Sequence, residues 1–303
     1  MAHVHHHDHS HANPEAAGNS RRLLWAFGLI SSFMLVEAIG GWLANSLTLL
    51  ADAGHMAMDA FALGLAAWAA SLAGRERNPH MTYGYQRVQV LVAALNALLL
   101  LALVVWIVVE AIGRLRAPQL MLPVPALIIA SIGFVVNLIA FRWLHGSHDM
   151  NSRAAALHVL GDLLGSVAAI TAALATWLWG WVYADPILAF VIGGILMRGA
   201  IAVLLEAGRI LLEGVPPGVD IEAIKAQLAT IDGVTDIHHV HAWSLTAEQP
   251  LLTAHAVLDA DANPQQVLDK LKHVLESDFG IEHSTIQIEP GSCPDETASA
   301  DDC

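Results

Sequence analysis

Two His-x-x-x-Asp pairs, His55 with Asp59 and His158 with Asp162, lie within long apolar segments of the chain. On a helix, residues i and i+4 lie one turn apart on the same face, so each segment would present an imidazole and a carboxylate together. Two nitrogens and two oxygens complete a tetrahedral set for a divalent metal such as Zn²⁺. Ionisable side chains are costly in hydrocarbon and mark a transport path or a relay there. The spacing therefore predicts a metal site inside a membrane.

The alternative is that each His–Asp pair is structural and braces a helix bundle. One buried pair fits that role, but two pairs of the same spacing on two segments favour metal binding. The ligands suit Zn²⁺, then Co²⁺ or Cd²⁺, because Mg²⁺ prefers oxygen and retained water. Asp52, on nearly the same face as Asp59, is predicted to lie beside the site or in a vestibule on its outer side without binding the ion. For the mid-segment residues Glu37, Asn96 and Asn137, interhelical hydrogen bonding and a transport role both remain open.

The composition is that of a helical membrane protein. Of the 303 residues, 55% are hydrophobic and only 14% are charged. Crossing a bilayer takes about 20 apolar residues, and we expect six transmembrane helices at residues 23–44, 47–72, 88–113, 124–145, 154–178 and 184–208. Asp185 before Pro186 predicts an N-cap for the sixth helix. Gly161 and Gly165 predict close approach of a neighbouring helix.

The distribution of Arg residues predicts the orientation. With both termini in the cytoplasm, eight Arg residues near helix ends fall on the cytoplasmic side and two, Arg114 and Arg116, on the other side. The second helix then enters from outside and the fifth from inside, and His55 and Asp162 each lie about eight residues deep, or about 12 Å. The two pairs can therefore meet near the midplane, where secondary transporters bind their substrates.

The last third of the chain is a separate, acidic domain. Residues 213–303 carry seventeen acidic residues and three Lys, so this part accounts for the imbalance behind the net charge of −14. Such acidity disfavours nucleic acid and suits a domain that handles cations. Hydrophobic periodicity predicts helices at 219–231 and 264–279 and strands at 234–246, 250–259 and 284–289. The order αββαβ indicates a small α+β fold with both helices on one face of a sheet.

We therefore expect four regions. These are a His-rich disordered cytoplasmic N-terminus at 1–20, a six-helix transmembrane domain at 21–212, a cytoplasmic metal-binding domain at 213–290 and a flexible tail at 291–303. Six His residues lie among the first eleven positions, but they are interrupted, which favours a metal-collecting arm over a cloning tag.

Further candidate ligands lie outside the membrane segments. In the C-terminal domain, neighbouring strands could bring together a group of side chains: His238, His239, His241, His255, His283 and Glu289. Any one of these His residues is more often a surface residue, but the group favours a metal site. Cys293 and Cys303, in the reducing cytosol, could extend it. His80, in the loop after the second helix, is either an accessory ligand or a solvated loop residue.

The same ligands predict how transport is driven. A metal binds neutral imidazole and ionised carboxylate, so protons compete with it, and His titrates near physiological pH. We expect efflux of Zn²⁺ from the cytoplasm in exchange for protons. A passive metal channel and a membrane-anchored metal sensor or storage protein are the alternatives. The sequence contains no His-Glu-x-x-His motif, nucleophile elbow or phosphate-binding Gly loop, so we expect no enzyme activity.

Several stretches resemble one known family. Ser46–Asp59 and Ala156–Asp162 are similar to the signatures of the cation diffusion facilitators. Val240–Thr246, Leu252–His255 and Glu282–Glu289 are similar to the cytoplasmic domain of that family. The likeness covers nearly the whole chain and is strongest with the ZitB-type bacterial zinc exporters.

The resemblance implies a homodimeric Zn²⁺/H⁺ antiporter of the bacterial inner membrane, with six transmembrane helices and a ferredoxin-like cytoplasmic domain. It implies a transport site at His55, Asp59, His158 and Asp162 and cytoplasmic sites at His238, His255, His283 and Glu289. His55 favours zinc, because manganese-type members carry Asn or Asp there. Tyr85 stands where some members have a second loop His, which leaves a loop site open. Two acidic domains in a dimer would repel, so bound Zn²⁺ is expected to draw them together and act as a regulatory ligand.

Overall fold

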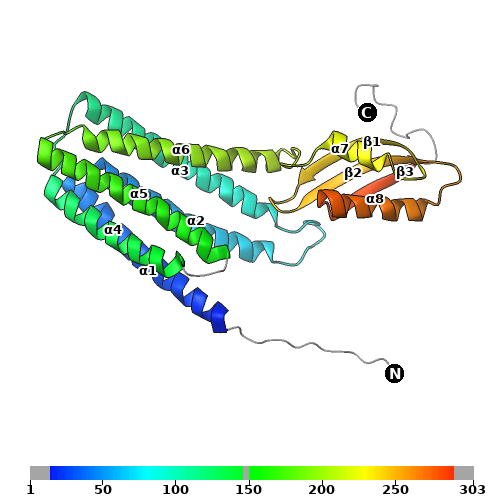
Figure 1. The fold of residues 1–303 in the computed structure, drawn as a ribbon, viewed down its shortest axis with the longest axis horizontal. Helices are drawn as coiled ribbons and strands as arrows, with labels where there is room; N and C mark the ends of the chain where they lie inside the picture. Colours follow the sequence, from blue (N-terminus) through cyan, green and yellow to red (C-terminus); the bar gives the residue numbers. More distant parts are fainter. Residues whose placement is uncertain (1–13, 146–149, 290–303) are drawn as a thin grey trace. The chain divides into compact units, whose positions relative to one another are not determined.

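The computed structural model describes residues 14–145 and 150–289 (Figure 1). Six long helices come first: α1 (Pro14–Ala44), α2 (Leu47–Ala73), α3 (Arg87–Arg116), α4 (Pro123–His145), α5 (Met150–Trp179) and α6 (Ala184–Leu211). Each contains one predicted segment, which confirms that the six segments are helical. By length and composition, α2 to α6 each contain a stretch that could cross a membrane, and the described apolar part of α1, Gly28–Ala44, is shorter.

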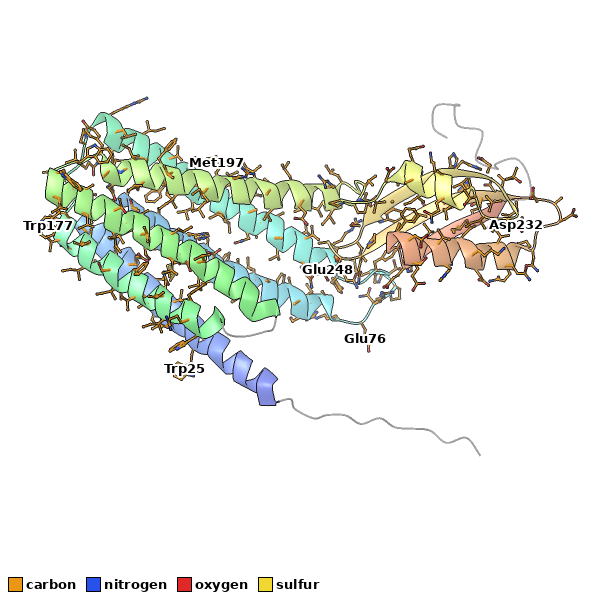
Figure 2. All side chains as sticks on the ribbon, viewed as in Figure 1. Trp25, Glu76, Trp177, Met197, Asp232 and Glu248 are labelled. Atoms are coloured by element: carbon orange, nitrogen blue, oxygen red, sulfur yellow. The ribbon has the colours of Figure 1, made fainter. Side chains whose placement is uncertain are left out.

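Large apolar side chains project outward from these helices (Figure 2). Trp25 near the start of α1 is 72% exposed, and Trp177 at the end of α5 is 56% exposed. Apolar surface of this kind is expected where lipid, rather than water, surrounds a helix.

Backbone contacts divide the chain into two compact units, and three helices contribute to both. The first unit contains Met1–Leu63 and Leu98–Ala200, and the second contains Gly64–Ala97 and Ile201–Cys303. The division therefore passes through α2, α3 and α6. Within the second unit, Val90 near the start of α3 packs against the end of α6.

In the first unit, α2 packs against two groups of helices. Its Leu49 lies in a cluster with small side chains of α1, α4 and α5. Its Leu47 packs with Ile107 of α3 and Ala189 of α6. The alanines in these clusters allow close helix–helix approach.

The start of α6 differs from the expectation. The helix begins at Ala184, so Asp185 is its second residue and the predicted N-cap role is wrong. The Asp185 carboxylate instead bonds to the start of α2. A short acidic side chain can reach a neighbouring helix as readily as its own backbone, and sequence spacing does not distinguish the two.

The second unit includes a small α+β fold. Its elements are α7 (Ile221–Leu228), β1 (Val234–Ser244), β2 (Pro250–Leu258), α8 (Pro264–Phe279) and β3 (His283–Glu289), which confirms the order αββαβ. Strand β2 is central, antiparallel to β1 and parallel to β3. Asp220 caps α7, and Asn263 caps α8.

Both helices of this fold cover one face of the sheet. A single core cluster joins Ile224 of α7 and Leu271 of α8 to Ala254 and Ala256 of β2. Side chains alternate along a strand, so His255 lies on the opposite face. That helix-free face carries the candidate ligands of the domain.

Candidate metal centres

The first predicted pair forms on α2 as its spacing indicates. His55 Nε2 lies 3.3 Å from Asp59 Oδ2, and the two side chains are 19% and 27% exposed. Asp162 lies on α5 and is 1% exposed. The backbone of His158 belongs to α5, but its side chain lies outside the described residues. The structure therefore describes three of the four predicted transport ligands.

A close contact fixes the levels of α2 and α5 relative to each other. A Cβ atom added to Gly165 of α5 would lie 2.8 Å from Cγ of Asp52, so the Asp52 carboxyl group rests on the α5 backbone. The two helices run in opposite directions (Figure 1). Three residues forward from Asp52 is His55, and three residues back from Gly165 is Asp162. Both therefore lie about 4.5 Å from the contact along the helix axes, at the same level.

The same counting continues to the second ligand of each pair. Asp59 is four residues beyond His55, and residue 158 is four residues before Asp162. The two His-x-x-x-Asp pairs are thus matched level by level, with a His opposite an Asp at each level. Gly165 makes this approach possible, whereas a Cβ at Gly161 would meet nothing within 4 Å.

Buried carboxyl groups from three helices gather beside this region. Glu37 of α1, Asp52 and Asp162 are 0%, 3% and 1% exposed. Glu37, Asp52 and Asp162 lie close enough to interact electrostatically with one another. Carboxyl groups packed together in this way either hold protons or, when ionised, are balanced by a cation. Asp52 is buried, so the expected vestibule does not open onto it, and Glu37 was not among the predicted site residues.

Asn137 has a structural partner on the neighbouring helix, whereas the buried Oδ1 of Asn96 has no hydrogen-bond partner. Asn137 of α4 donates to Ser166 of α5 at 3.4 Å, which is the interhelical hydrogen bond considered for it. His55, Asp59 and Asp162 do not form a group of three with ligand atoms within 4.8 Å in the described part of the chain. Holding an ion would therefore require movement of these side chains or of the two helices, and movement around a central site is how transporters alternate access.

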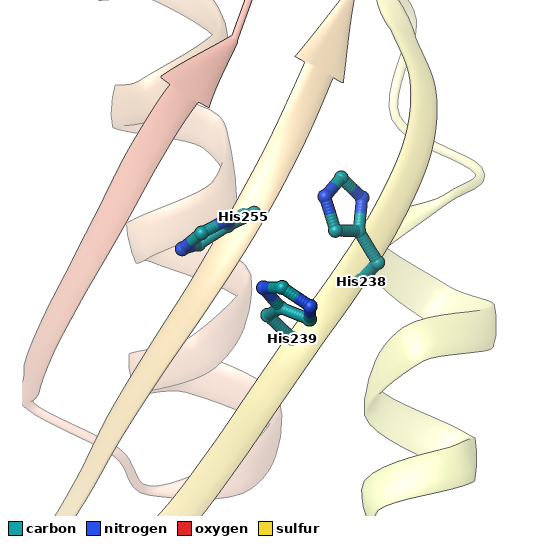
Figure 3. Close-up of side chains that lie close together, drawn as sticks. All are labelled: His238, His239 and His255. Atoms are coloured by element: carbon teal, nitrogen blue, oxygen red, sulfur yellow. The ribbon is translucent and has the colours of Figure 1, made fainter. Parts of the chain in front are cut away.

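In the α+β fold, three imidazoles meet on the helix-free face of the sheet (Figure 3). His238 and His239 of β1 and His255 of β2 can each offer a nitrogen within 4.8 Å of the others. Their ring centroids are 4.8 to 5.4 Å apart. This is the one such group among residues 14–145 and 150–289.

Glu289 of β3 adds a carboxylate to this cluster. It is 1% exposed, with Oε1 2.9 Å from His255 Nδ1 and Oε2 3.3 Å from His238 Nε2. Apart from this 3.3 Å contact with each other, His238 Nε2 and Glu289 Oε2 are buried without a hydrogen-bond partner. In a tetrahedral zinc site with bonds of about 2.0–2.1 Å, neighbouring ligand atoms are about 3.3 Å apart. The donor set therefore fits Zn²⁺.

The remaining predicted ligands lie elsewhere. His283 begins β3, six residues from Glu289 and therefore about 20 Å away along the strand. It lines a cavity of about 470 Å³ with Glu248 and Glu282. His241 is exposed beside a cavity of about 460 Å³. The structure does not bring either residue to the imidazole cluster.

Two other predictions concern residues away from these sites. His80 is exposed in the loop after α2, and its backbone N–H donates to Asn78 Oδ1 at 3.0 Å. Cys293, Cys303 and the His-rich N-terminus lie outside the described residues.

Comparison with known proteins gives two family matches that together cover most of the chain. Residues 23–212 match a model described as the cation efflux transmembrane domain. Residues 216–291 match a model described as the cation efflux protein, cytoplasmic domain.

Several relatives match most of the chain and most of their own length. A protein named zinc transporter ZitB from Pectobacterium atrosepticum is 44% identical over 97% of this chain and 92% of its own length. The protein of that name from Escherichia coli is 43% identical over 97% and 94%. A protein named cadmium, cobalt and zinc/H⁺–K⁺ antiporter from Bacillus subtilis is 38% identical over 91% of each chain.

Proposed function

This chain belongs to the cation efflux family, the cation diffusion facilitators, and we propose that it exports Zn²⁺ from the bacterial cytoplasm in exchange for protons. Its relatives named zinc transporters cover nearly its whole length. We place it in the inner membrane as a multi-pass homodimer with both termini in the cytoplasm. The two family matches support a transmembrane domain at 21–212 and a cytoplasmic domain at 213–290.

The transport site consists of His55, Asp59, His158 and Asp162. The observation that carries this assignment is the contact of Asp52 with Gly165, because it sets His55 level with Asp162 on antiparallel helices. Two imidazoles and two carboxylates suit tetrahedral Zn²⁺ and discriminate weakly against Co²⁺ and Cd²⁺. The buried carboxyl groups of Glu37 and Asp52 can ionise when a divalent cation lies beside the site and then favour its binding.

Proton exchange follows from the chemistry of these ligands. Zn²⁺ binds when the imidazoles are neutral and the carboxylates are ionised, and protons entering from an acidic exterior displace the ion outward. The emptied site then loses its protons inside and binds Zn²⁺ again. The relative named as a zinc/H⁺–K⁺ antiporter supports an exchange of this kind.

The cytoplasmic domain binds the same metal as a regulatory ligand. His238, His255 and Glu289 converge on one face of the sheet and supply nitrogen and oxygen donors. The acidic composition of residues 213–303 makes two such domains repel in a dimer, and bound Zn²⁺ reduces that repulsion. Scattering from the dimer should therefore report a more compact shape with Zn²⁺ than without it.

The main proposal is tested by transport into liposomes containing the purified protein. Zn²⁺ flux should require a pH gradient, and Asp162→Asn should abolish it without lowering the melting temperature. Asp261→Asn, in an exposed position of the cytoplasmic domain, should transport as the wild type does. Flux that ignores the pH gradient would indicate a channel, and Zn²⁺ binding without flux would indicate a sensor or storage protein.

A further inference from the structure

Strand β1 carries one extra residue where it passes the imidazole cluster. His238 pairs with His255, and His241 pairs with Thr253, so three steps along β1 oppose two steps along β2. His239 lies within this bulge and has φ = 48°, in the left-handed region. That conformation costs a non-glycine residue about 1–2 kcal/mol, and glycine is the usual residue at a left-handed bulge position.

The bulge changes which side chains share a face. In a regular strand, consecutive residues point to opposite faces, so His238 and His239 would be separated by the sheet. Here both rings lie against His255, with centroids 5.4 Å and 4.8 Å from it (Figure 3). The strained backbone therefore delivers a third imidazole to the helix-free face. Strain that persists in a fold tends to accumulate at functional sites.

The side chains beside these imidazoles are placed as they are around metal ligands in known sites. Asp236 Oδ2 lies 2.9 Å from His238 Nδ1, which turns Nε2 of the same ring toward Glu289 Oε2. A carboxylate on the outer nitrogen of a ligating His is the usual orienting contact. The ligand nitrogens lie within 4.8 Å of one another, so a modest closure brings them to the spacing of about 3.3 Å required around Zn²⁺.

We propose that His239 is a zinc ligand and that the left-handed bulge serves to deliver it. One chain then supplies a complete tetrahedral set: His238, His239, His255 and Glu289. This rests on the proposed metal-binding role of the cytoplasmic domain and extends it. A set completed within one chain does not require His283, the tail cysteines or a second protomer.

The test is a titration of the full-length protein, purified in detergent, with Co²⁺ followed by absorption and with Zn²⁺ against a chromophoric chelator. His239→Asn removes the imidazole and keeps a side chain that tolerates the left-handed region, and His239→Gly removes the imidazole and the strain together. His241→Asn is the matched control, because His241 is exposed and outside the cluster. Metal bound at the transport site and at the N-terminal His residues contributes equally to the titration of all these proteins, so differences between them report the cytoplasmic site.

Both His239 variants should bind the metal ion of the cytoplasmic site at least tenfold more weakly than the wild type. They should also lose part of the absorption of tetrahedral Co²⁺, while His241→Asn matches the wild type in both measurements. His239→Gly should remain folded, with a metal-free melting temperature no lower than that of the wild type. A metal affinity and Co²⁺ absorption equal to those of the wild type, in either His239→Asn or His239→Gly, would overturn the inference. Zn²⁺ flux into liposomes tests the proposed function separately, since its loss in the wild-type protein would leave this titration unaffected.

Discussion

The backbone N–H of Leu47, the first residue of α2, donates a 2.7 Å hydrogen bond to Oδ2 of Asp185 in α6. Oδ1 of the same carboxylate accepts from Thr48 N at 3.1 Å and from Ser46 Oγ at 2.7 Å. The first N–H groups of a helix lack partners within it and carry partial positive charge. A buried anion from another helix therefore caps α2, and Arg114 lies 3.7 Å from it.

Substituting Asp185 with Asn should loosen the start of α2, two turns before His55. The amide keeps one acceptor but loses the charge, and it leaves the Arg114 guanidinium buried without one of its anions. Hydrogen bonds to a charged group contribute about 1.5–3 kcal/mol each, so we expect a loss of about 3 kcal/mol in stability. The measurements are the melting temperature in detergent and the rate of Zn²⁺ transport. An unchanged melting temperature, with Asp261→Asn as the reference, would contradict the capping role.

Gly165→Ala tests whether Zn²⁺ transport depends on the close contact that aligns α2 with α5. The added methyl group would collide with the Asp52 carboxyl group and push the helices apart. Overpacking of this kind costs about 1–3 kcal/mol, and transport should fall with it. Gly161→Ala is the matched control on the same helix, because its methyl group meets nothing within 4 Å and alanine favours helix. Equal transport by both variants would show that the contact does not position the site.

Local sequence patterns predicted most of the fold. Apolar segment length located all six long helices, and the alternation and turn residues located the three strands. The i,i+4 spacing also predicted the contact between His55 and Asp59. In each case the information lies within one element, where helix and strand geometry relate spacing to position.

Contacts between elements were less predictable. Arg114 was counted as a charge on the outer side, but it is 7% exposed and pairs with Glu110 and Asp185. The position of His239 depends on a bulge, because in a strand with regular alternation its side chain would lie on the face of the sheet opposite to His255. Such contacts follow from register and packing, which a single sequence does not state.

Glu37→Gln should weaken Zn²⁺ transport although Glu37 is not a proposed ligand. It removes a carboxyl group that can ionise when a divalent ion is near, and in a low-dielectric interior such a charge attracts the ion strongly. We expect the KM for Zn²⁺ to rise about tenfold, which corresponds to about 1.4 kcal/mol. Transport kinetics in liposomes measure this, with Glu206→Gln on the exposed side of α6 as the control. A KM equal to that of the control would mean that the cluster is only structural.

Asp236→Ala should weaken Zn²⁺ binding in the cytoplasmic domain without destabilising the metal-free protein. Asp236 is 62% exposed, so its removal costs the fold little, but it orients the His238 ring through Nδ1. Loss of such an orienting carboxylate typically weakens metal binding about 10–100-fold. At a Zn²⁺ concentration 100 times the wild-type Kd, bound metal adds about 2.7 kcal/mol of stability, and a tenfold weaker site adds only about 1.4 kcal/mol. The Zn²⁺-dependent rise in the unfolding temperature of the domain should therefore shrink in Asp236→Ala and not in Asp261→Ala, and excess chelator should remove the difference. A full rise in Asp236→Ala would show that His238 does not depend on this contact to bind the metal.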